Sequence, residues 1–224
     1  MRFGLRSGAD VICEKPLVLN PWNIDGLAEI ERDTGHKINT ILQLRLHPAI
    51  IALREKMQNG PRDSKVDVDL TYITSRGHWY LQSWKGDTRK SGGIGTNIGV
   101  HFVFGALQEN VVHPNTPAKA AGYLEYERVR VRWFLPIDGA DVPKPQRDAG
   151  QRTYRSITCD GAEVEFSAGF TALHTRSYEE IFAGRGFGLE ENRVAIESVS
   201  YIRAALPSEN MGERHPYLTQ TLEG

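Results

Sequence analysis

The hydrophobic pattern of this 224-residue chain changes at Lys65, and the change restricts the folds that the chain can adopt. Before Lys65, short apolar runs alternate with segments of helical period, which predicts strands at 11–13 and 37–46 and helices at 20–35 and 47–60. After it, apolar residues alternate with polar ones, beginning with Val66, Val68 and Leu70. Such alternation is typical of antiparallel strands with one face in water. The sequence therefore predicts two different kinds of sheet.

The later part of the chain predicts further strands and three helices. Strand regions are expected at 65–71, 121–137 and 153–168, and helices at about 97–108, 174–183 and 190–206. Residues 138–151 are rich in proline, glycine and aspartate and predict a mobile loop. In the helix at 47–60, the residues expected to face inward are Ile50, Ile51, Leu53 and Met57.

The predicted fold class is α+β, with an open-faced, mainly antiparallel sheet that carries helices on one face. A β-α-β-α unit precedes this sheet and has the order found at the end of a doubly wound dinucleotide-binding domain. We expect residues 1–46 to be the C-terminal remnant of such a domain and residues 47–224 to form a substrate and oligomerisation domain. The helix at 190–206 is expected to pack back on the remnant.

Lys15 is the first candidate for a catalytic group. Val11, Ile12 and Cys13 indicate a buried parallel strand, which the turn-forming Lys15-Pro16 step ends. Pro16 biases Lys15 toward extended geometry. Ligands of open α/β sheets bind beyond the carboxyl ends of the strands, so an ammonium at this position points into a cleft. The structural alternative is an exposed lysine that simply ends a strand.

A second candidate lies in the segment Ser91-Gly92-Gly93-Ile94-Gly95-Thr96-Asn97-Ile98-Gly99-Val100-His101. Thr96 or Asn97 can cap the predicted helix, and Asn97 and His101 are four residues apart, on one face near its start. Histidine is well suited to exchange a proton near neutral pH. The structural alternative is a histidine that only packs in the helix.

Four features together resemble the glucose-fructose oxidoreductase and inositol dehydrogenase superfamily: Glu14-Lys15-Pro16, Trp84-Lys85, Ser91-Gly92-Gly93 and the spacing from Asn97 to His101. The segments 80–87, 96–102, 128–135 and 178–189 look like the branch that oxidises UDP-N-acetylglucosaminuronic acid at C3 in lipopolysaccharide biosynthesis. The resemblance implies an NAD-dependent sugar dehydrogenase in which Lys15 and His101 flank the carbon that loses a hydride. Most of the superfamily has aspartate where this chain has Asn97. The proton is therefore assigned to Lys15 and His101, and the Asn97 oxygen is expected to face His101.

A UDP-uronate favours cationic and aromatic partners. It carries a carboxylate and a diphosphate, which lysine and arginine bind, and flat surfaces that aromatic rings cover. The expected substrate site consists of Arg45, Arg76, Tyr80, Lys85, Ser91, Asn97 and His101. The resemblance implies cofactor contacts from Glu14, Lys15, Trp84 and Lys85. Arg89 and Lys90 offer further positive charge for this ligand, and a solvated loop explains these two residues equally well.

No Gly-x-Gly-x-x-Gly turn precedes Lys15, although a dinucleotide-binding domain should open with one. The glycines at 184–188 are rejected as a substitute, since they follow a predicted helix. The resemblance implies that most of the NAD-binding domain, on the order of a hundred residues, is absent. We therefore expect this chain alone to be inactive and not to bind NAD measurably. Two functions stay open: the C-terminal part of a dehydrogenase, and an inactive module for sugar-nucleotide binding or assembly.

Composition limits the other classes of partner. A formal net charge of -1 gives no reason to expect nucleic acid as a partner. Two cysteines, the lack of a secretory signal and the lack of a long apolar stretch predict a cytoplasmic protein with no membrane contact. The histidines lack the spacing of metal ligands. Val129, Val131 and Trp133 are expected on a sheet face that the few helices cannot cover, which predicts a homo-oligomer joined through that face.

Overall fold

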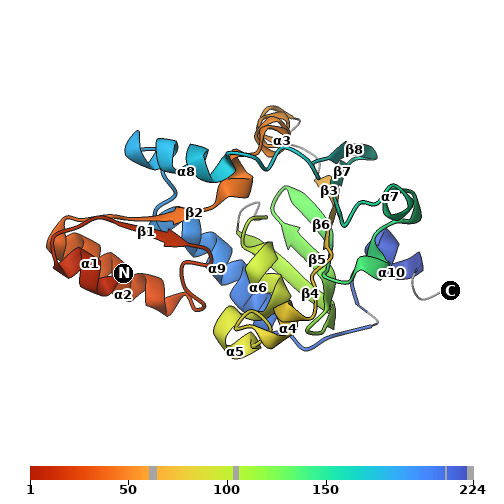
Figure 1. The fold of residues 1–224 in the computed structure, drawn as a ribbon, viewed down its shortest axis with the longest axis horizontal. Helices are drawn as coiled ribbons and strands as arrows, with labels where there is room; N and C mark the ends of the chain where they lie inside the picture. The colour runs from red at the N-terminus through yellow and green to blue at the C-terminus, as the bar shows by residue number, and fades with distance from the viewer. Residues whose placement is uncertain (61–64, 103–105, 210, 221–224) are drawn as a thin grey trace.

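The structure, a computed structural model, describes residues 1–60, 65–102, 106–209 and 211–220. Figure 1 shows a small sheet with helices at one end of the molecule and a larger sheet beside it. The first part contains α1 (Arg2–Arg6), β1 (Val11–Glu14), α2 (Trp22–Thr34), β2 (Ile38–Ile41), the 3-10 helix η1 (Gln43–Leu46) and α3 (Pro48–Asn59).

The larger sheet and its helices make up the rest of the described chain. Its strands are β3 (Val66–Thr74), β4 (Leu107–Asn115), β5 (Lys119–Tyr126), β6 (Val129–Pro136), β7 (Thr153–Cys159) and β8 (Ala162–Glu165). Its helices are α4 (Trp79–Gln82), α5 (Thr88–Ser91), α6 (Gly93–Gly99), the 3-10 helix η2 (Gly139–Asp141), α7 (Lys144–Asp148), α8 (Leu173–Phe182), α9 (Leu189–Ala204) and α10 (Pro216–Gln220).

The small sheet is the predicted parallel pair. β1 and β2 run in the same direction, from Val11 opposite Ile38 to Glu14 opposite Ile41, and α2 connects them. α2 buries the apolar stripe Ile24, Leu27 and Ile30, and it ends at Gly35. The φ of Gly35 is 73°, a left-handed conformation that glycine adopts without strain.

Two details of this part differ from the sequence prediction. The strand expected at 37–46 ends at Ile41 and η1 follows it, because its partner β1 ends just before Pro16, which has no N–H to continue the pairing. β1 is also less buried than expected, with Ile12 37% exposed. In the part of the chain that the structure describes, β1 pairs along one edge only.

The larger sheet has the strand order β4-β5-β6-β3-β7-β8. β3 and β6 are parallel, and the remaining neighbours are antiparallel, so the predicted mainly antiparallel sheet is confirmed. The strand region expected at 121–137 is a hairpin of β5 and β6. The strand region expected at 153–168 contains β7 and β8, which a turn at Asp160 and Gly161 connects.

The prediction of a helix at 97–108 is wrong. α6 begins at Gly93 and ends at Gly99, and three of its seven residues are glycines, which are poor helix formers. Leu107 begins β4 instead, because this segment pairs with β5, with Val111 opposite Tyr123. Residues 103–105 of that prediction lie outside the described residues. The loop expected at 138–151 contains η2 and α7.

The two faces of the larger sheet differ in chemistry. Val129, Val131 and Trp133 are buried in one core with Leu53 of α3, Ile98 of α6 and Ile202 of α9. The hypothesis that these three strand residues lie on an uncovered face is therefore wrong. The opposite face carries the ion pairs Arg130–Asp67 and Arg132–Asp69, whose members lie opposite each other in the parallel register. In Figure 1, α6 and α9 lie on one side of the sheet and the short helices α7 and α10 on the other.

Helix α9 joins the two parts of the molecule. Ile196 and Val199 pack in a second core with Ile24 and Leu27 of α2. Ile202, the residue three positions after Val199, packs against the larger sheet. α9 thus contributes apolar residues both to the core of the small sheet and to that of the larger one. Among the helices in these described ranges, none is long and apolar enough to cross a membrane.

Candidate active site

Lys15 lies directly after β1, at the carboxyl end of the small parallel sheet. Its Nζ donates hydrogen bonds to both oxygens of Asn97, the backbone carbonyl and Oδ1, and the Nζ–Oδ1 distance is 2.6 Å. Asn97 is on α6, 82 residues further along the chain. The amine is therefore held at the junction between the small sheet and the helices that cover the larger one.

The side-chain amide of Asn97 is fixed at both ends. Oδ1 accepts from Lys15, and Nδ2 donates to the Tyr80 hydroxyl at 3.0 Å. The Asn97 oxygen, which was expected to face His101, is hydrogen-bonded to Lys15. The result is a hydrogen-bonded chain of three side chains, Lys15, Asn97 and Tyr80.

The surroundings of Lys15 favour its neutral form. Burial, followed by the nearby charges of Lys85 and Arg76, lowers the pKa of Lys15 to about 8, although Glu14 acts in the opposite direction. Near neutral pH, the side chain is therefore present in both protonation states. A group of this kind can give or take a proton during a reaction.

His101 is buried and uncharged at neutral pH. Burial, and then the charges of Lys15 and Arg45, lower the pKa of His101 well below its usual value. Its Nδ1 is buried and has no hydrogen-bond partner among the described residues. An unpaired buried ring nitrogen is costly. The histidine therefore has an unused hydrogen-bonding position next to Lys15.

A cavity of about 330 Å³ brings most of the predicted site together. The predicted residues that line it are Glu14, Lys15, Arg76, Tyr80, Lys85, Asn97 and His101. They come from β1, from the segment that follows β3, and from α6 and the residues after it. Basic side chains outnumber acidic ones in this lining, so the cavity favours an anionic ligand.

Three predicted residues lie outside this lining. Arg45 donates to the backbone oxygen of Glu191 at 3.3 Å, and burial with the nearby Arg54 lowers its pKa to about 10. Ser91 is buried and accepts a hydrogen bond from the backbone N–H of Gly93, so it shapes the turn before α6. Trp84 is half exposed and lies at the rim of the cavity, beside Lys85.

The rim of the cavity carries an aromatic pair around one cation. The Nζ of Lys85 lies 5.7 Å from the centre of the Trp79 ring and 5.8 Å from that of Trp84. Both distances are within the range of a cation–π contact. About half of each tryptophan is exposed, so flat apolar surface is available beside a positive charge.

Several lining residues were not predicted from the sequence: Gln43, Tyr72, Arg155, Phe170 and His174. His174 lies 3.2 Å from the carboxylate of Glu14, which connects α8 to β1. The sequence contains a pattern that could have identified Arg155. Residues 155, 157 and 159 share one face of β7, and Ile157 and Cys159 make that face apolar. A charged residue on an apolar strand face indicates a special role.

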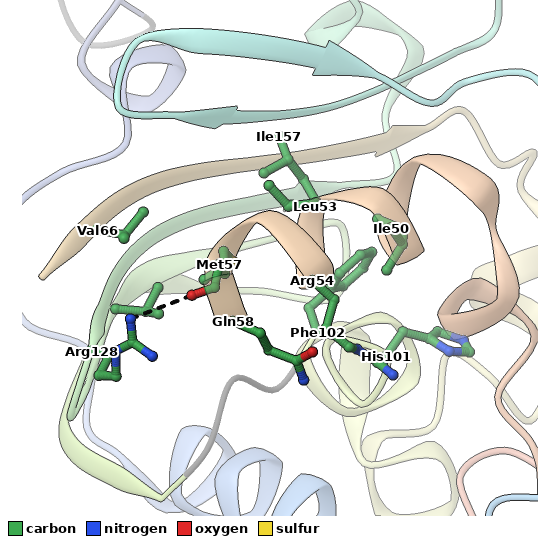
Figure 2. A pocket seen from close by; sticks show the side chains of 11 residues that line it. Ile50, Leu53, Arg54, Met57, Gln58, Val66, His101, Phe102, Arg128 and Ile157 are labelled. Atoms are coloured by element: carbon green, nitrogen blue, oxygen red, sulfur yellow. Dashed lines mark hydrogen bonds between the residues drawn. The ribbon is translucent and has the colours of Figure 1, made fainter. Parts of the chain in front are cut away.

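A second cavity, of about 280 Å³, lies between α3 and the larger sheet, and Figure 2 shows it. Leu53 and Met57 line it, and Arg128 at its edge donates to the backbone oxygen of Met57 at 3.4 Å. This cavity explains why Ile50 and Met57, which were expected to face inward, are only half buried. His101 borders both cavities, but Lys15 and Asn97 border only the first. The first cavity is therefore the candidate active site.

Comparison with solved structures identifies the family. The WlbA (WbpB) dehydrogenase from Thermus thermophilus, solved in complex with NAD and UDP-GlcNAcA, is 49% identical to this chain, with a TM-score of 0.91. The match covers 96% of this chain and 71% of that one. This chain belongs to the WlbA (WbpB) dehydrogenase family. A second structure of the Thermus thermophilus WlbA dehydrogenase, with NAD and alpha-ketoglutarate, is 50% identical over 96% of this chain and 72% of its own, with a TM-score of 0.91.

More distant structures share the fold of the WlbA family. The WlbA dehydrogenase from Bordetella pertussis, solved with NADH and UDP-GlcNAcA, matches 90% of this chain and 70% of its own at 14% identity, with a TM-score of 0.70. No protein-family model matches the chain. The predicted resemblance to the UDP-N-acetylglucosaminuronic acid dehydrogenase branch is confirmed by the Thermus thermophilus enzyme. Within the described residues, no group of three His, Cys, Asp or Glu side chains could hold a metal ion.

Proposed function

We propose that this chain takes part in the NAD-dependent oxidation of a UDP-N-acetylglucosaminuronic acid at C3, as a step of surface polysaccharide biosynthesis in the cytoplasm. The main support is the pairing of two proton carriers in one cation-lined cavity. Lys15 has a pKa of about 8, and the buried His101 beside it is neutral. Membership of the WlbA family supplies the substrate and the cofactor of the proposal.

A carbinol carbon loses a hydride only as its hydroxyl proton leaves. Neutral His101 has a free ring nitrogen to accept that proton, and Lys15 in its ammonium form can donate a hydrogen bond to the developing oxygen. Asn97 and Tyr80 hold the lysine in one place, because its Nζ is bound to both Asn97 oxygens. The proposed roles are therefore proton transfer for Lys15 and His101 and positioning for Asn97.

The residues at the carboxyl end of β1 fit the cofactor. Glu14 and Lys15 border the cavity there, and the exposed ring of Trp84 beside Lys85 offers a flat surface with a positive charge. We assign Glu14, Lys15, Trp84 and Lys85 to NAD. When bound, NAD accepts the hydride. Arg76 and Lys85 provide positive charge for the carboxylate or diphosphate of the substrate.

Two measurements test the proposal. Calorimetry on the chain measures binding of UDP-GlcNAcA, and absorbance at 340 nm measures NADH formation from NAD and UDP-GlcNAcA after the NAD-binding domain of a WlbA dehydrogenase has been fused to the chain. Binding with turnover supports the dehydrogenase. Binding without turnover supports the alternative, a module that takes up the sugar nucleotide and leaves it unchanged. If UDP-GlcNAcA does not bind at millimolar concentration, both assignments are wrong.

A further inference from the structure

Arg155 is held in the active-site cavity by two aromatic rings. It lies opposite Tyr72 in the antiparallel pairing of β7 with β3, so the two side chains share one face of the sheet. The guanidinium carbon is 4.8 Å from the centre of the Tyr72 ring and 4.2 Å from that of Phe170. One nitrogen, Nη1, donates to the backbone oxygen of Ser167 at 3.1 Å. The plane of the guanidinium is thereby fixed.

Among the strand arginines, this cation is the one without a counter-ion in the described part of the chain. On the opposite face, Arg130 and Arg132 each pair with an aspartate directly across the sheet. Arg155 forms no ion pair with any carboxylate of the described residues, and its Nε is buried without a hydrogen-bond partner there. A partly desolvated guanidinium with a free donor is costly unless an acceptor arrives.

We propose that Arg155 binds the carboxylate of the uronic-acid sugar and so makes the site select an acidic sugar nucleotide over its neutral counterpart. The inference rests on the proposed function. It concerns a residue that the sequence analysis did not assign and gives the cavity a specific recognition element. Arginine suits this task because its planar fork matches the two oxygens of a carboxylate.

The position of Arg155 separates this task from proton transfer. Arg155 comes from β7, whereas Lys15 follows β1 and His101 follows α6. All three border the same cavity, so a sugar ring between them can present its C3 hydroxyl to one wall and its carboxylate to another. A site with a buried donor that only one ligand satisfies rejects the analogue that lacks the matching group.

Calorimetry with two ligands tests the proposal. UDP-GlcNAcA carries the carboxylate, and UDP-GlcNAc is the neutral counterpart with the same nucleotide and diphosphate. Both are titrated into the wild-type chain, into Arg155→Gln and into the control Arg130→Gln, which removes a charge from the other face of the same sheet. Thermal unfolding shows whether each variant is folded.

We expect the wild type and Arg130→Gln to prefer UDP-GlcNAcA. In Arg155→Gln, the affinity for UDP-GlcNAcA should fall by about tenfold or more, the usual effect of losing a charged hydrogen bond, while that for UDP-GlcNAc stays the same. An equal loss of affinity for both ligands would mean that Arg155 binds the diphosphate, and unchanged affinities for both ligands would mean that it binds neither the carboxylate nor the diphosphate. Either result overturns the proposal and leaves the proposed function standing.

Two other outcomes are also decisive. If the wild type binds neither ligand, the proposed function fails first and the role of Arg155 fails with it. If Arg155→Gln does not fold, Arg155→Lys replaces it. Lysine keeps the positive charge but lacks the planar fork, so the preference for UDP-GlcNAcA should fall in the same direction by a smaller factor. A preference in Arg155→Lys equal to that of the wild type would overturn the proposal.

Discussion

The exchange of Asn97 for aspartate should raise the pKa of Lys15. In the wild type, the neutral Oδ1 of Asn97 accepts a hydrogen bond from Lys15 at 2.6 Å, and burial and the charges of Lys85 and Arg76 hold the pKa near 8. An aspartate in the same position keeps the geometry and adds a negative charge. The Tyr80 hydroxyl can then donate to the carboxylate, so the side chain keeps both partners.

The size of the effect follows from this contact. Two unit charges about 4 Å apart attract by roughly 4 kcal/mol at an effective dielectric constant of about 20. One pKa unit corresponds to about 1.4 kcal/mol, and measured effects of an adjacent opposite charge are about 1 to 3 units. The neutral fraction of Lys15 at pH 7.5 should therefore fall from roughly a quarter to roughly 3% or less.

Competitive acetylation measures this pKa on the chain itself. The rate at which trace acetic anhydride labels Lys15 is followed from pH 6 to 11 by peptide mass spectrometry, with the exposed Lys144 as the internal reference. The control is Asn59→Asp, which adds the same charge at an exposed position at the end of α3. The inflection should stay near pH 8 in the control and move upward in Asn97→Asp. An inflection at or below pH 8 in Asn97→Asp would refute the role of Asn97 in keeping Lys15 partly neutral.

Three further predictions concern catalysis, packing and pH. In a fusion of the chain to the NAD-binding domain of a WlbA dehydrogenase, Lys15→Met and His101→Ala should each lower NADH formation by roughly two orders of magnitude while UDP-GlcNAcA still binds; equal loss of binding would indicate a structural role instead. Gly122→Ala should lower the free energy of unfolding by about 1 to 3 kcal/mol or more in urea titrations, because a Cβ there would lie 2.2 Å from the Val111 oxygen and 2.7 Å from the Trp133 ring. Gly99→Ala, whose Cβ would make an ordinary contact at 3.6 Å, is the control and should not lower the free energy of unfolding. Burial, with the charge of Arg132, lowers the pKa of His215 to about 3, so the unfolded chain takes up a proton near pH 6.5 that the folded chain does not. Stability should therefore fall by up to about 1.4 kcal/mol per pH unit below pH 6.5, and His215→Gln should reduce this slope; an unchanged slope would contradict the argument.

The position of Lys15 could be predicted from local sequence. An apolar run followed by Lys-Pro ends a strand for steric reasons that involve only neighbouring residues. The same holds for α2, α8 and α9, whose apolar stripes repeat with helical period, and for the alternation in β6. The mainly antiparallel sheet after Lys65 was also predictable, because strands with one polar face repeat with a period of two.

Other features depend on contacts between distant segments. β4 lacks a clear alternating pattern and is a strand because β5 pairs with it. The helix α6 ends at Gly99, although a helix was predicted to continue to residue 108, because the chain from Leu107 pairs with β5. The sequence shows that β6 has an apolar face, but only the packing of α3, α6 and α9 shows that helices cover this face.

By itself, the sequence determined the residue types of this site and the position of Lys15 at the end of a parallel strand. The tertiary structure decided which groups meet there. The contact between Lys15 and Asn97 joins residues 82 positions apart, and it sets both the orientation of the amine and its burial. Arg155 enters the site through its register with Tyr72 across β3 and β7. Local patterns report the period and ends of each element, whereas pairing register and burial arise only when the whole chain packs.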